Sequence, residues 1–298
     1  MVTRESGGYK FRFLPMRIVT CSGHTIMIPR TTTGLRSGFA LFAAGGPVVT
    51  ALLFIPVALL PWGMTASCLL AANIVLALFS WIPMTLAGTH TDGRLLRTLA
   101  GKGPASERLA AILYVTAIDN CGARPREWPR EIVDCLAAAA SEAGNPVFRA
   151  EAAVLQLVHA LDVGEIGAIA GALERLLSQD RHLRPALRRV CFSEAAFFQG
   201  VYRRQPVPAG EWLEDARKVK GAVAEKDWDS FAMGAVAFAR QDWEEARRQF
   251  ARAIAYLDRR AGNRGSLLAA RGRVVALMES MPAPGQAIAA TATPNPGT

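Results

Sequence analysis

The chain has 298 residues, of which 51% are hydrophobic and 20% are charged, and its formal net charge is +9. No RNA- or DNA-binding motif accompanies the positive charge, so we expect no nucleic-acid partner; basic residues beside a membrane segment account for much of it. Five dispersed cysteines form no Cys-x-x-Cys pair, which argues against a disulfide scaffold and favours a reducing compartment.

Residues 1–37 are basic and contain no apolar core of the kind that a signal peptide has. Apolar and cationic side chains alternate in Tyr9–Phe13, and a second short strand-like run follows at His24–Ile28. We predict a small N-terminal β-hairpin at the membrane surface, pairing about Lys10–Thr20 with His24–Pro29. An irregular basic leader is the alternative interpretation.

The next segment, residues 38–103, contains a long run without Lys, Arg, Asp or Glu that ends at Asp92. A helix needs about 20 apolar residues to cross a bilayer, so the run is too long for one crossing and fits two. We predict transmembrane helices at Phe39–Leu60 and from Met64 to about Leu86. A buried helical hairpin of a soluble protein is the alternative.

A few residues interrupt the apolar pattern of this two-helix transmembrane hairpin. Gly45, Gly46 and Pro47 lie inside the first span, where they mark a kink or a close helix contact. Asn73 is the one strong polar group of the second span, and Pro83 bends its exit. A polar amide in lipid faces either a site or a partner helix, and both interpretations of Asn73 stay open.

Charge on either side of the hairpin predicts its orientation. The connecting loop at Trp62 is uncharged, whereas basic residues precede and follow the two spans: Arg30, Arg36, Arg94, Arg97 and Lys102. Because loops rich in Lys and Arg remain on the cytoplasmic side of a membrane, both termini of this multi-pass protein are expected in the cytoplasm.

Residues 104–281 carry apolar side chains at helical spacing and predict a cytosolic α-helical domain. The expected helices are Ala105–Cys121, Pro129–Ala143, Pro146–Leu161, Ile166–Gln179, Leu183–Tyr202, Glu211–Glu225, Asp227–Arg240, Trp243–Arg260 and Gly265–Ser280. Residues 282–298 contain no charge, are rich in Pro, Ala and Thr, and predict a disordered tail. The fold class is therefore mainly α.

One pair of expected helices has tetratricopeptide-like features. Small and aromatic residues fall at the offsets of that repeat: Gly234, Ala237, Ala246, Phe250 and Ala253. The small residues would let two helices approach while the Phe fills the space between them. The usual Trp and closing Pro are absent, so one degenerate repeat and a plain helical hairpin both stay open.

The exit of the hairpin carries the residues best suited to chemistry. A carboxylate such as Asp92 at the end of a membrane helix is costly unless it is paired, solvated or bound to metal. With imidazoles beside it, the carboxylate would suit zinc as one of three protein ligands. His90 could face the same ion, although a surface histidine is the simpler interpretation, and Asp92-Gly93 is by itself an ordinary turn. His24 is assigned to a strand, and His159 and His182 to helices.

The segments Ala43-Ala44-Gly45-Gly46-Pro47, Pro83 and Thr91-Asp92-Gly93-Arg94-Leu95-Leu96 resemble a bacterial branch of the site-2 protease family of intramembrane zinc metallopeptidases. The resemblance implies a location in the bacterial inner membrane and makes Asp92 the third zinc ligand. It implies structural positions near the site for Gly45, Pro47, Asn73, Pro83 and Gly93.

The chain departs from the family in its other ligands. They come from a His-Glu-x-x-His helix, two imidazoles one turn apart beside a general base, and none of the four histidines here has that context. Met1 is therefore either internal to a longer protein, or the chain is a degenerate pseudoenzyme. We assign no catalytic residue and expect no zinc in this chain as given. The alternative function is a membrane-anchored helical-repeat scaffold that binds a protein partner.

Overall fold

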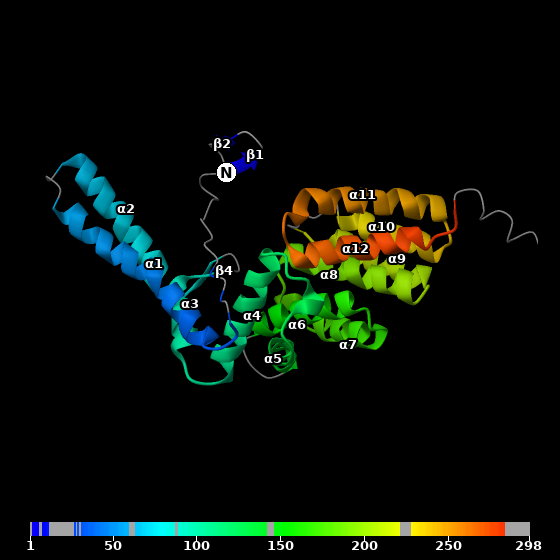
Figure 1. The fold of residues 1–298 in the computed structure, drawn as a ribbon, viewed down its shortest axis with the longest axis horizontal. Coiled ribbons are helices and arrows are strands. Elements are labelled where there is room, and N and C mark those ends of the chain that lie inside the picture. The colour runs from blue at the N-terminus through cyan, green and yellow to red at the C-terminus, as the bar shows by residue number, and fades with distance from the viewer. Residues whose placement is uncertain are drawn as a thin grey trace, which may run out of the picture.

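The protein is described from a computed structural model, which defines residues 2–5, 8–11, 27, 29, 31–59, 63–86, 89–141, 146–220 and 228–283. The described chain is mainly helical, which confirms the expected fold class. A long pair of apolar helices projects from a larger helical body (Figure 1).

The projecting pair consists of α1 (Leu35–Ala58) and α2 (Met64–Trp81). Large apolar side chains remain exposed along both helices, including Leu41, Val49, Leu53, Ile55, Leu69, Ile74, Leu76 and Leu78. Of the described helices, Leu35–Val57 is the one long and apolar enough to cross a membrane by length and composition, and the apolar stretch of α2, Met64–Leu78, is shorter.

The second helix ends earlier than the sequence pattern predicted. We expected it to continue to about Leu86, but α2 ends at Trp81 and Ile82 is extended. The reason is Pro83, because a residue that precedes proline is driven out of the helical region. The chain then forms β3 (Thr85–Leu86), which pairs antiparallel with β4 (Thr89–His90).

The short helix α3 (Asp92–Ala100) joins the hairpin to the helical body. It packs against α1, so the base of α1 is covered while the rest projects (Figure 1). Leu35 and Phe39 of α1 and Leu99 of α3 belong to the same buried apolar cluster as Leu109 of the following helix. The hairpin is thus anchored in the core of the helical body.

The helical body contains nine α-helices among its described residues. They are α4 (Pro104–Asn120), α5 (Arg130–Ser141), α6 (Pro146–Val163), α7 (Ile166–Leu177), α8 (Pro185–Phe197), α9 (Pro206–Lys218), α10 (Asp229–Ala239), α11 (Trp243–Ala261) and α12 (Gly265–Glu279). Short 3₁₀ turns occur at Pro125–Glu127 (η2) and Asp180–His182 (η3), and a π turn at Phe198–Tyr202 (η4). Each expected helix therefore has a counterpart.

In the helical body, the predicted start of α9 was wrong. The sequence Pro206-Val207-Pro208 was interpreted as a breaker before a helix at Glu211, whereas α9 begins at Pro206. The first turn of a helix tolerates proline, because the N–H that proline lacks would have no helical partner there.

The helices α8–α12 form a bundle beside α4–α7 (Figure 1). In this bundle, Phe197, Phe231 and Phe250 pack together, with the rings of Phe197 and Phe231 stacked at 4.2 Å between centroids. A Cβ added to Gly234 of α10 would stand 2.5 Å from the ring of Phe250 on α11. The glycine therefore lets the two helices approach, as expected, which any close helical hairpin also requires.

At the N-terminus, β1 (Val2–Glu5) pairs antiparallel with β2 (Gly8–Phe11), a pairing that we did not predict. The predicted hairpin of Lys10–Thr20 with His24–Pro29 lies mostly outside the described residues, as does the expected tail after residue 283.

Candidate functional site

The carboxylate of Asp92 lies against the backbone of α1 at Gly46. A Cβ atom added to Gly46 would stand 2.5 Å from Oδ2 of Asp92. A Cβ atom added to Gly45 would have no neighbouring atom within 4 Å. Asp92 is half-buried, and no described residue pairs its carboxylate by a hydrogen bond or an ion pair. An unpaired carboxylate beside an apolar helix pair is costly, which makes this position the leading candidate for function.

The turn that carries Asp92 is fixed to the end of α2. A Cβ added to Gly93 would stand 2.2 Å from the carbonyl oxygen of Trp81, so this close approach requires glycine. The hydroxyl of Thr91 donates to the carbonyl of Ile82 at 2.7 Å and accepts from the backbone N–H of Met84 at 3.1 Å. The start of α3 and the exit of α2 are therefore held together next to the carboxylate.

Asn73 bonds across the helix pair. Its Nδ2 donates to the carbonyl of Thr50 on α1 at 3.3 Å, and the side chain is buried. Pro47, inside α1, is also fully buried. Of the two interpretations left open for Asn73, the contact between helices is the one present.

The histidines are not gathered around Asp92 in the part of the chain that the structure describes. His24 and the side chain of His90 lie outside it. His159 stacks on Trp128 at 6.2 Å between ring centroids, and burial lowers its pKa although Asp162 raises it in part. His182 accepts a hydrogen bond from Nε of Arg181 at 3.2 Å.

The described donors do not fit a catalytic zinc ion by themselves. Such a site needs three protein ligands, and no group of three or more His, Cys, Asp or Glu side chains that could hold a metal occurs among the described residues. Asp92 is one suitable ligand, and we derive no reaction step from it alone. Of the positions that the resemblance places near the site, Gly93 follows Asp92 directly, and the assignments of Gly45, Pro47 and Pro83 stay predictions.

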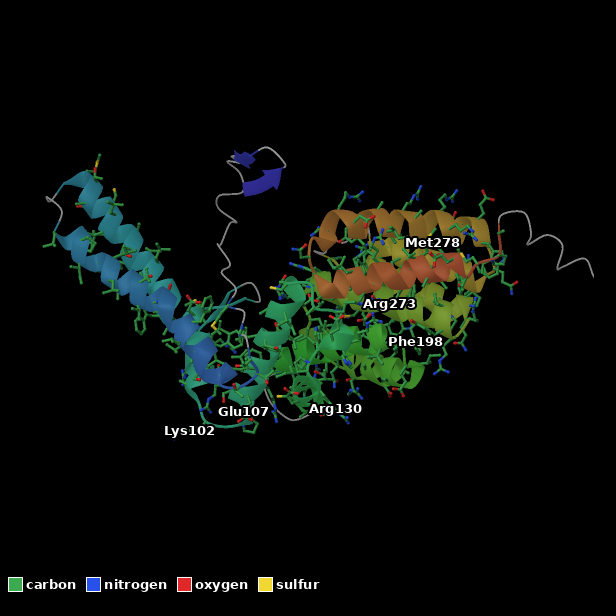
Figure 2. All side chains as sticks on the ribbon, viewed as in Figure 1. Lys102, Glu107, Arg130, Phe198, Arg273 and Met278 are labelled. Carbon is green, nitrogen blue, oxygen red and sulfur yellow. The ribbon has the colours of Figure 1, made fainter. Side chains whose placement is uncertain are left out.

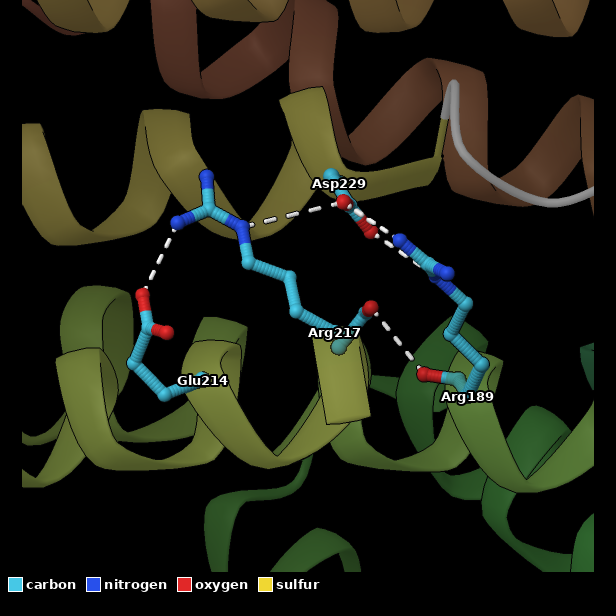
Figure 3. A network of polar contacts seen from close by, with 5 residues as sticks. Arg189, Glu214, Arg217 and Asp229 are labelled. Atoms are coloured by element: carbon cyan, nitrogen blue, oxygen red, sulfur yellow. Dashed lines mark hydrogen bonds and ion pairs between the residues drawn. The ribbon is translucent and has the colours of Figure 1, made fainter. Parts of the chain in front are cut away.

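The helical body contains an ionic network that the sequence did not reveal; it is largely buried at Arg189 and Asp229 and exposed at Arg217 and Glu214. Arg189 of α8 donates from Nε and Nη2 to the two carboxylate oxygens of Asp229 at 3.0 and 2.6 Å (Figure 3). Arg217 lies 3.8 Å from the same carboxylate and also pairs with Glu214 at 2.8 Å. Because the network joins α8, α9 and the start of α10, its role is to hold these helices together.

A second polar pair joins α12 to α8. Arg273 of α12 donates to Glu194 of α8 at 3.1 Å, and its guanidinium lies over the rings of Phe197 and Phe231. Nearby, burial raises the pKa of the Cys191 thiol well above its ordinary value, with Glu194 raising it further. A buried thiol of this kind is inert, so Cys191 is no nucleophile.

An open groove of about 830 Å³ runs between α9 and α10. Apolar side chains, Leu213, Met233 and Val236, form part of its lining. Charged groups also line it: the acids Glu211, Glu214, Asp215, Asp242 and Glu245, and the bases Arg217, Lys218 and Arg240. The groove is therefore acidic on balance in a chain whose net charge is +9.

Comparisons with protein-family models, with characterised proteins and with solved structures found no match to this chain.

Proposed function

We propose that α1, α2 and α3 form part of the membrane core of a site-2-protease-type metallopeptidase, the part that carries the carboxylate ligand. The supporting observation is the contact between Asp92 and Gly46. Two of the sequence elements that carry the resemblance, the Gly-Gly-Pro element and the Asp-Gly turn, touch in the fold.

The apolar surface supports a membrane location for this core. Exposed large apolar residues extend from Leu41 in α1 to Leu59 just past its end, and from Met64 at the start of α2 to Ile82 just past its end. At about 1.5 Å per residue, each stretch covers about 28 Å, close to the ~30 Å of the hydrocarbon layer. We therefore propose that both helices cross the membrane, as a hairpin with cytoplasmic ends.

On this proposal the carboxylate lies inside the membrane boundary on the cytoplasmic side. Gly46 is five positions beyond Leu41, or about 7 Å deeper along the helix axis. Zinc bound there would supply a polarised water for peptide hydrolysis within the membrane. This chain contributes Asp92 as the single ligand, held by Gly93 and the Thr91 hydroxyl, and alone it has no peptidase activity.

Zinc analysis of the purified protein tests the proposal. The 298-residue chain in detergent should contain no stoichiometric zinc. A longer chain, extended by any in-frame His-Glu-x-x-His segment encoded before residue 1, should contain one zinc that Asp92→Ala removes. Glu107→Ala is the matched control, because Glu107 is an exposed acid just beyond α3 (Figure 2). Zinc that stays in the extended chain after Asp92→Ala would refute the assignment.

The groove between α9 and α10 favours a second function, a membrane-anchored scaffold. Its apolar lining and its excess of acids suit a basic partner segment with an apolar anchor residue. A synthetic peptide of alternating Lys and Leu should bind the full chain, more weakly in high salt, and Met233→Asp should abolish binding. Leu268→Asp, on the exposed face of α12, is the control. Equal binding by both variants would exclude the groove.

A further inference from the structure

A small, partly open cavity lies in the helical body, away from Asp92. It measures about 130 Å³ and occupies the space where α6, α8 and α12 meet. Its apolar lining includes Leu157 and Leu161 of α6, Val190 of α8, and Leu267 and Ala270 of α12. An apolar cavity of about this size can hold a molecule the size of benzene.

A buried hydrogen-bond donor without an acceptor belongs to a residue that lines this cavity. Nε1 of Trp228 has no partner, and only 6% of that residue is exposed. The neighbouring Arg273 is also largely buried, but its guanidinium already bonds to Glu194 and to the hydroxyl of Tyr202, so the indole N–H is the donor that remains. Buried donors are nearly always satisfied, so such a group requires an explanation, and an acceptor in the cavity would supply one.

The charges around the cavity are already balanced. Arg273 donates to Glu194, and Asp162 accepts from the backbone N–H of Arg126 and pairs with Arg124. An additional charge in this space would have no counter-ion and would have to be desolvated. The cavity therefore suits a neutral molecule.

We propose that this cavity binds a small neutral molecule, with an apolar body of about one aromatic ring and one hydrogen-bond acceptor directed at Nε1 of Trp228. The site does not depend on the membrane core, and it would remain if the protease relationship were refuted.

Three small probes of similar shape test the proposal with the full chain in detergent. Phenol offers an acceptor, toluene has the same size without one, and benzoate carries a charge. Titration calorimetry should give phenol at least a fivefold tighter binding than toluene and should detect no benzoate binding. The indole N–H resonance of Trp228 should shift with phenol.

Two variants complete the test. Ala270→Leu fills the cavity and should abolish the binding of both neutral probes, while Ala255→Leu on the exposed face of α11 should not. Trp228→Phe keeps the ring but removes the donor, so it should reduce the preference of phenol over toluene. The proposal is overturned if neither neutral probe binds, if benzoate binds as well as phenol, or if Trp228→Phe leaves the preference unchanged.

Discussion

Gly46 of α1 and Asp92 of α3 touch, because the missing side chain of the glycine leaves room for the carboxylate. The contact joins the apolar hairpin to the turn that follows it. The two neighbouring glycines therefore differ: Gly46 contacts the carboxylate, whereas Gly45 has open space beside it.

Gly46→Leu should therefore displace the Asp92 turn, whereas Gly45→Leu should not. The new side chain would occupy the position of Oδ2 and push α3 away from α1. Limited proteolysis of the detergent-solubilised chain should show faster cleavage around residues 91–103 in Gly46→Leu alone. Equal protection in the two variants would mean that the turn does not lie against Gly46.

The pair of Arg189 and Asp229 should contribute much more to stability than the neighbouring Arg217. Arg189→Met leaves a buried carboxylate without its main partner, a change that costs about 3–5 kcal/mol. Arg217 is 40% exposed, so Arg217→Met should cost about 0–1 kcal/mol. Urea unfolding of both variants measures the difference.

A double variant separates the charge effect from packing at the same pair. Arg189→Met combined with Asp229→Asn removes both charges, so it should be less destabilised than the sum of the two single variants. Strict additivity would show that the two side chains do not act as a pair.

The contact of Gly234 with Phe250 predicts that no side chain larger than glycine fits at position 234 without loss of stability. Gly234→Ala places a methyl group into the ring of Phe250 and should destabilise by about 1–3 kcal/mol. Gly272→Ala is the control, because nothing lies within 4 Å of that position and alanine is favoured over glycine in a helix by about 0.5–1 kcal/mol. Phe250→Leu added to Gly234→Ala should recover part of the loss in thermal melting.

Most helices could be predicted from the sequence because periodicity and breakers are local. The helices α11 and α12 begin at the positions expected, at Trp243 and Gly265. Two boundaries failed where proline has two effects: Pro83 ended α2 early, and Pro206 started α9 rather than preceding it. Proline can end one helix or begin the next, and which of the two occurs depends on the residues that follow it.

The site could be predicted only in part, because its contacts are not local. The sequence indicated Asp92 and the Gly-Gly-Pro element separately, but not that Gly46 rather than Gly45 meets the carboxylate. The pair of Arg189 and Asp229 left no signal, since the two residues are 40 positions apart and each also suits an exposed helix surface. Such pairs depend on how whole helices are arranged.

His159 should make the folded state less stable in acid. Burial lowers its pKa below the ordinary value of 6.5, with Asp162 opposing the shift. The unfolded chain therefore binds a proton before the folded chain does, so the contribution is present above pH 6.5 and is lost as the pH falls through the folded-state pKa. Burial raises the pKa of Glu151 and Asp119. Their effect on the pH dependence of stability is opposite to that of His159, because their contribution to stability is lost as the pH rises. Comparing the wild type with His159→Gln isolates the histidine, and the urea midpoint of the variant should fall less between neutral pH and a pH below 6.5. An identical fall in both proteins would show that His159 titrates alike in the folded and unfolded states.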